Sequence, residues 1–155
     1  MPRCRCPWCV SSMPQGGRDD LVRYIGSFDN SSWFLIGVFE RAPGERMIGF
    51  NAVYVDWAHR EYMINTLIGE SDARHKGARS ETRLPIHAYF LEELGLESSV
   101  CTVVEGHPSL ALMESWGWKT EHRSEKASAS SGAPIGFLHM RLTKSAWRRA
   151  NGMSS

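Results

Sequence analysis

The sequence has no excess of charge of either sign. Its 18 lysine and arginine residues stand against 17 aspartate and glutamate residues, which gives a formal net charge of +1 at pH 7. A protein that binds nucleic acid needs a basic surface to hold the phosphate backbone. The near balance of charge therefore argues against nucleic acid as a partner.

Long hydrophobic runs are also missing. No apolar run reaches the roughly 20 residues that a membrane-spanning helix requires, and the first residues lack the apolar core of a signal peptide. A chain of 155 residues can bury about two-thirds of its unfolded surface in one domain. We therefore expect a cytoplasmic protein without a membrane partner. Its single domain covers residues 19–147, between an irregular N-terminus at 1–18 and a polar tail at 148–155.

Cysteine is scarce, and three of the four cysteines stand close together. Cys4, Cys6 and Cys9 lie within the first ten residues, whereas Cys101 falls in an apolar run. A structural zinc site commonly takes four ligands, and no nearby histidine completes a set here. We therefore expect no metal, with free thiols at the N-terminus and Cys101 as a small core residue. The alternative is a non-enzymatic interaction protein whose N-terminal cysteines bind a metal.

Aromatic and β-branched runs predict three antiparallel strands in the first half of the chain. They cover residues 33–40, 47–57 and 62–69, after a short helix at 19–25. Apolar periodicity then predicts a helix at 80–94, kinked or broken near Pro85 because proline cannot donate a backbone hydrogen bond. The remaining elements are expected at 99–105 (strand), 108–116 (helix), 119–125 (strand) and 135–143 (strand), with a flexible loop at 126–134 and a polar tail from Lys144.

A basic loop stands between the third strand and the long helix. Arg74, Lys76 and Arg79 surround Gly77 just before the helical pattern begins. The first N–H groups of a helix have no internal acceptor, and the helix dipole favours an anion there. Gly77 has no Cβ, so a phosphate group can approach the backbone closely. The loop therefore predicts a pyrophosphate site; the alternative is an ordinary junction with solvated basic residues.

Four short pieces carry a family resemblance that runs from about residue 19 to residue 147. They are Ile48-Gly49, Arg74-His75-Lys76-Gly77 followed by Ser80-Glu81-Thr82, the run AYFLEELGL at 88–96, and Ser109 placed eight residues before Gly117-Trp118 with Glu121 behind them. In this order and spacing the chain resembles the GNAT superfamily of acyl-CoA N-acyltransferases, most closely the RimJ/RimL-type branch. The resemblance implies an α/β (α+β) fold with a mixed, largely antiparallel central sheet flanked by helices.

The resemblance also implies an activity and a cofactor site. The activity is transfer of an acetyl group from acetyl-CoA to a primary amine, of a small molecule or a protein N-terminus, by direct attack of the amine. No metal is implied, and a homodimer is common among relatives. The residues that would bind the cofactor lie on the third strand and in the basic loop: Thr66, Leu67, Ile68, Arg74, His75, Lys76, Gly77, Ala78, Arg79 and Ser80.

Two residues are the expected catalytic groups. The resemblance places Ser109 near the cofactor sulfur, where its hydroxyl can protonate the leaving thiolate. Glu121 matches a family position and is a candidate base, as are Glu61 and Glu70 from the sequence. The alternatives are a helix-capping role or a plain surface hydroxyl for the serine, and solvated surface charges for the glutamates.

A histidine base is a further possibility, at His87 or His107. A lone histidine in a sequence is more often structural than catalytic, so we rank both below the glutamates.

The chain departs from the family pattern at several positions. His75 stands where glycine is usual, and Arg79 where glycine or alanine is usual. Gly106 replaces an asparagine, Met113 replaces the tyrosine acid of related branches, and the N-terminal part is short. These departures leave open a second reading, a CoA-binding relative that has lost transferase activity.

Overall fold

The computed structural model describes residues 17–41, 44–70, 72–73, 77–127 and 132–153. In chain order the elements are α1 (Arg18–Gly26), β1 (Trp33–Phe39), β2 (Met47–Asp56), β3 (Glu61–Ile68), α2 (Ala78–Ala88), the π-helical turn η2 (Tyr89–Glu93), β4 (Ser98–Val104), α3 (Leu110–Ser115), β5 (Lys119–Ala127), β6 (Pro134–Thr143) and α4 (Lys144–Ala150). None of the helices within these residues has the length and apolar character of a bilayer span.

One mixed sheet organises the fold. Its six strands lie in the order β1-β2-β3-β4-β6-β5, and every neighbouring pair is antiparallel except β3 and β4. The prediction of a mixed, largely antiparallel sheet flanked by helices is therefore confirmed. The three strands before the basic loop form a meander, as their composition predicts.

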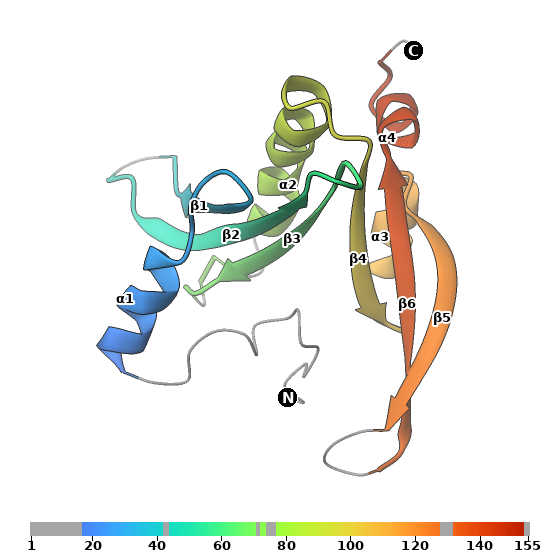
Figure 1. Cartoon of the computed structure of the whole chain (residues 1–155), viewed down its shortest axis with the longest axis horizontal. Coiled ribbons are helices and arrows are strands. Elements are labelled where there is room, and N and C mark those ends of the chain that lie inside the picture. The colour runs from blue at the N-terminus through green and yellow to red at the C-terminus, as the bar shows by residue number, and fades with distance from the viewer. Residues whose placement is uncertain (1–16, 42–43, 71, 74–76, 128–131, 154–155) are drawn as a thin grey trace.

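The sheet has one helix-covered face and one open face. Side chains of alternate residues point to opposite faces, so Ile36, Val53, Tyr62, Cys101 and Met140 share one face through the strand register. On that face they pack with buried residues of η2, α3 and α4 in one core: Phe90, Leu91, Met113, Ala146 and Trp147. Figure 1 shows α2 along β2 and β3, and α3 behind β4 and β6.

The other face carries Trp33, Tyr54, Met63, Thr102 and His139, and we call it the open face. Helix α1 has no buried residue.

The long helix differs from its prediction at Pro85. Helix α2 continues across the proline and widens one turn later into η2, where Leu94 N–H donates to the carbonyl of Tyr89. The buried side chains of Phe90 and Leu91 lie in this wider turn. The prediction of a break at Pro85 is therefore wrong. The helix is continuous through the proline, and its hydrogen-bond pattern changes only in the π-helical turn that follows.

The C-terminal region also differs, because the polar tail expected from Lys144 is helix α4. Thr143 caps this helix by accepting a hydrogen bond from the Ala146 N–H at 3.2 Å, and Trp147 is buried. Arg148 reaches back to Glu92 with two hydrogen bonds of 2.9 and 2.6 Å. The predicted domain boundary at residue 147 therefore falls inside a helix. The loop expected at 126–134 is also shorter, because β5 runs to Ala127 and β6 begins at Pro134.

A buried histidine makes the stability of the fold depend on pH. His87 is only 2% exposed, and its Nδ1 lies 2.6 Å from the hydroxyl of Tyr62. Burial, aided by the charge of Arg83, lowers the pKa of His87 to about 3. Burial also raises the pKa of Tyr62 above its ordinary value, so the phenol stays protonated and donates to the imidazole.

We expect acid to destabilise the fold through His87. The unfolded chain binds a proton at His87 below a pH of about 6.5, whereas the folded chain binds it only near pH 3. The stability from the neutral histidine is thus complete above pH 6.5 and is lost as the pH falls towards 3, at up to about 1.4 kcal/mol per pH unit. Urea denaturation at pH 7, 6, 5 and 4 should show a shallower loss of stability in His87→Gln, whose amide oxygen still accepts from Tyr62.

The matched control is the exposed His59, whose pKa is raised by its hydrogen bond to Asp56. His59→Gln should not make the loss of stability in acid shallower. A histidine whose pKa is raised in the folded state adds stability at low pH, so removing it cannot protect the fold there. An unchanged slope in His87→Gln would contradict the prediction.

Candidate functional site

The two central strands of the sheet part from each other. Strands β3 and β4 pair only through Glu61 with Ser98 and Tyr62 with Ser99. Beyond these pairs β3 continues to Ile68 and β4 to Val104, and in Figure 1 the two strands diverge. Within the described chain, β3 and β4 form no ladder pair beyond Tyr62 and Ser99. The edge of a strand that lacks a neighbouring strand can bind an extended ligand through its backbone.

The open end of this gap receives the N-terminus of α2. Gly77 precedes the helix with a φ of 81°, a left-handed conformation that favours glycine. Its carbonyl accepts the N–H groups of Ser80 and Glu81 at 2.9 and 3.0 Å, and no side chain of the described residues caps the helix start. The structure therefore has a helix that begins directly after Gly77.

The basic side chains of the predicted anion site are not placed. Arg74, His75 and Lys76 lie outside the described residues, as do the side chains of Ala78 and Arg79. Their phosphate-binding role stays a prediction.

The predicted cofactor residues of β3 lie in the diverging half of the strand. The Thr66 hydroxyl donates to Oδ1 of Asn51 at 2.7 Å, and Ile68 packs on the small cluster of Val38, Ile48 and Ala73. These two side chains are thus used by the fold. Leu67 pairs with Phe50 of β2 on the open face, and the cofactor role of residues 66–68 stays a prediction.

Ser109 meets a histidine at the start of α3. Nδ1 of His107 lies 2.7 Å from the Ser109 Oγ and accepts the backbone N–H of Ser109 at 3.1 Å. A ring nitrogen that accepts an N–H is unprotonated, so the Ser109 hydroxyl is the donor in its contact with Nδ1. The Sδ of Met113 lies 3.9 Å from the same Oγ.

The serine side chain makes no capping hydrogen bond to its helix, so the structure does not favour a capping role for Ser109. His107 N–H donates to the carbonyl of Val104, which puts this turn at the end of β4 and thus at the open end of the gap.

Glu121 and Glu61 lie at the closed end instead. Both accept hydrogen bonds from Arg141, at 2.7 Å each, and the same guanidinium donates to Ser98 Oγ at 2.6 Å. The two carboxylates raise the pKa of Arg141. Glu121 itself is the extra residue of a β-bulge between Thr120 and His122.

The structure therefore does not bring the two predicted catalytic residues together. Glu121 neutralises a cation at the start of β4, whereas Ser109 follows its end. Glu70, the third carboxylate considered as a base, lies 3.7 Å from Arg46 at the protein surface.

The histidines considered as bases have different surroundings. His87 is buried, and its ring packs against those of Tyr62 and Trp118, which makes it structural. His139, which sequence reasoning missed, lies on the open face between two hydroxyls, 3.2 Å from Thr102 and 2.8 Å from Ser124.

The His139 ring stacks on that of His122 with centroids 4.0 Å apart. Burial, then the charges of His122 and Lys126, lowers the pKa of His139. His139 lies on β6, which is separated from the gap by β4.

Solved N-acetyltransferase structures share this fold. Spermidine N-acetyltransferase from Vibrio cholerae, in complex with CoA and spermine, has a TM-score of 0.71 at 17% identity over 86% of this chain and 79% of its own. A chimera of the Vibrio cholerae enzyme with hSSAT has a TM-score of 0.73 at 16% identity over 88% and 85%. The enzyme SpeG with manganese ions gives 0.69 at 16% over 88% and 76%. No family model and no curated protein sequence matches the chain.

These similarities confirm the predicted GNAT-like fold. At this low identity they establish the fold alone, and the RimJ/RimL-type branch stays a prediction.

We expect Arg141 to hold the closed end of the gap. Arg141→Gln leaves Glu61, whose side chain is 25% exposed, without its cation, and should lower the free energy of unfolding by about 1–2 kcal/mol. Urea denaturation measures the loss.

Arg123→Gln is the matched control, because Arg123 bridges Glu105 and Glu125 with side chains about half exposed. Exposed pairs contribute little, so its loss should stay below about 0.5 kcal/mol. Equal losses in the two variants would show that the closed end has no special role.

Proposed function

We propose that this protein is an acyltransferase that moves an acetyl group from acetyl-CoA to the primary amine of a small molecule. One observation supports this most: β3 and β4 part beside the starts of both α2 and α3, in a fold shared with N-acetyltransferases. An extended cofactor fits between the two β-strands. Its phosphates would lie at the start of α2, and the hydroxyl of Ser109 stands at the start of α3.

The cofactor would lie along β3. In the proposal the amide groups of residues 66–68 bind its pantetheine arm, and residues 74–80 hold its pyrophosphate. Gly77 and the uncapped start of α2 supply the anion site. A backbone N–H of β3 can stabilise the oxyanion that develops on the thioester oxygen.

The reaction needs two proton movements. The amine nitrogen attacks the thioester carbon, the carbon–sulfur bond breaks, and the amine loses a proton while the thiolate gains one. In the proposal His107 Nδ1 holds the Ser109 hydroxyl through a hydrogen bond until the thiolate forms. The hydroxyl then turns from His107 to the thiolate, donates its proton to the sulfur and recovers one from solvent.

The proton from the amine goes to a base on the open face. The acceptor enters from this face, because η2, α3 and α4 cover the other one. His139 with Thr102 is placed there. Glu121 serves as a base only if it releases Arg141.

A small-molecule acceptor is the preferred class. The neighbour that holds CoA also holds spermine, a small amine. A protein N-terminus, membership of the RimJ/RimL-type branch, a homodimer and a cytoplasmic location stay predictions from the resemblance. The alternative is a CoA-binding relative without transferase activity. Measuring thioester consumption with a panel of amines distinguishes an active transferase from this alternative.

We predict that a negative charge at Gly77 abolishes CoA binding. Gly77→Asp places a carboxylate at the proposed pyrophosphate site, and isothermal titration with CoA should show affinity reduced at least about tenfold. Gly77→Asn is the matched control, because aspartate and asparagine tolerate the left-handed backbone similarly. If the two variants bind CoA equally, the phosphates lie elsewhere.

We predict that Ser109 acts in the chemical step. Ser109→Ala should lower kcat by about 10²–10⁴-fold, the usual contribution of a general acid, and leave CoA affinity nearly intact. Ser115→Ala on the same helix is the control, since its hydroxyl bonds only the carbonyl of Leu112. A loss of no more than about threefold in Ser109→Ala would mean that solvent protonates the thiolate.

A further inference from the structure

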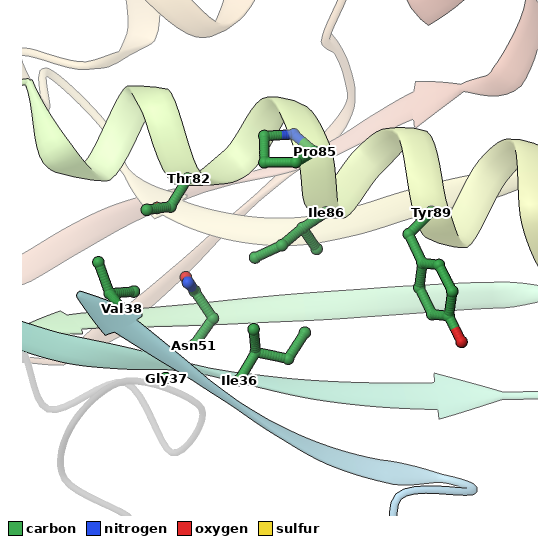
Figure 2. Close-up of a pocket in the computed structure, with 8 residues that line it drawn as sticks. All are labelled: Ile36, Gly37, Val38, Asn51, Thr82, Pro85, Ile86 and Tyr89. Carbon is green, nitrogen blue, oxygen red and sulfur yellow. The ribbon is translucent and has the colours of Figure 1, made fainter. Parts of the chain in front are cut away.

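A groove lies between α2 and the first two strands, on the side of the helix away from β4. Its volume is about 290 Å³. Most of its wall is apolar: Ile36, Val38, Pro85, Ile86 and Tyr89. Figure 2 shows these side chains converging from the strands below and the helix above. The groove is separate from the gap between β3 and β4.

One buried polar group points into this apolar space. Asn51 on β2 is 0% exposed, and Figure 2 shows its amide directed toward the helix between Thr82 and Ile86. Its Oδ1 accepts the hydroxyl of Thr66, but its Nδ2 has no hydrogen-bond partner among the described residues. A buried donor without an acceptor costs roughly 1–3 kcal/mol, so a protein that keeps one beside a groove gains when a ligand satisfies it.

The size and charge of the groove restrict the class of ligand that can bind there. An apolar cavity of about 150 Å³ binds benzene, and this groove has about twice that volume. None of the described residues that line it is charged, so these residues would not compensate an ionised ligand for its lost hydration. The free donor of Asn51 requires an acceptor on the ligand.

We propose that this groove binds a neutral, ring-sized apolar molecule with one carbonyl oxygen, which accepts a hydrogen bond from Asn51 Nδ2. The ring lies against Ile36, Ile86 and Tyr89. This site is independent of the proposed acyl transfer, because no residue of the groove belongs to the proposed reaction.

Benzamide and toluene test the proposal on the full chain. Both carry the same ring, and only benzamide carries a carbonyl. Titration followed by methyl NMR should show both probes shifting the methyl resonances of Ile36 and Ile86. Benzamide should bind about threefold to tenfold more tightly, the net contribution of one hydrogen bond.

Variants separate the hydrogen bond from the groove itself. Asn51→Leu keeps the volume but removes the donor, and should make the two probes bind equally. Asn151→Leu makes the same change on the C-terminal side of α4 and should keep the preference for benzamide. Ile36→Trp fills the groove and should abolish binding of both probes.

The proposal fails if benzamide leaves the Ile36 and Ile86 methyl resonances unmoved. It also fails if the preference for benzamide persists in Asn51→Leu. Should Asn51→Leu not fold, loss of benzamide binding in folded Ile36→Trp supports the site, and unchanged binding overturns it.

Discussion

The candidate site depends on the short parallel pairing between β3 and β4. Each strand keeps its antiparallel partner on the outer side: β3 stays with β2 to Ile68, and β4 stays with β6 to Val104. Only two residue pairs join the strands to each other. The sheet therefore consists of two three-stranded halves, β1-β2-β3 and β4-β6-β5, which are joined only at one end. The twist of the sheet then separates β3 from β4 at the other end. The Arg141 guanidinium lies at the joined end, between carboxylates from both halves.

The one-sided packing of the helices gives this gap two different sides. Buried residues of η2, α3 and α4 form a single core with one face of the sheet, including the Tyr62–His87 pair and Trp118. The other face keeps polar groups such as His139 and Arg141 near the surface. A cofactor bound in the gap would thus meet a rigid core on one side and an accessible polar surface on the other.

Much of the fold could be predicted because the signals are local. The alternating apolar pattern of residues 47–57 and the periodic pattern of residues 80–94 reflect which side of each element is buried. The helix at the C-terminus was missed because it has one aromatic anchor, Trp147, and its other support is distant in sequence, at Glu92. The continuation of α2 across Pro85 was missed because a π-helical turn leaves no clear mark in sequence.

The sequence by itself determined the order of the elements, the basic loop before α2 and the hydroxyl at the start of α3. These features depend on residues close in the chain, where periodicity, glycine and helix ends act directly. Only the tertiary structure decided that Ser109 lies at the open end of the gap while Glu121 binds Arg141 at the closed end. Only the tertiary structure left Nδ2 of Asn51 without a hydrogen-bond partner among the described residues. Such contacts follow from strand register and helix placement, which join residues far apart in sequence, so no local pattern specifies them.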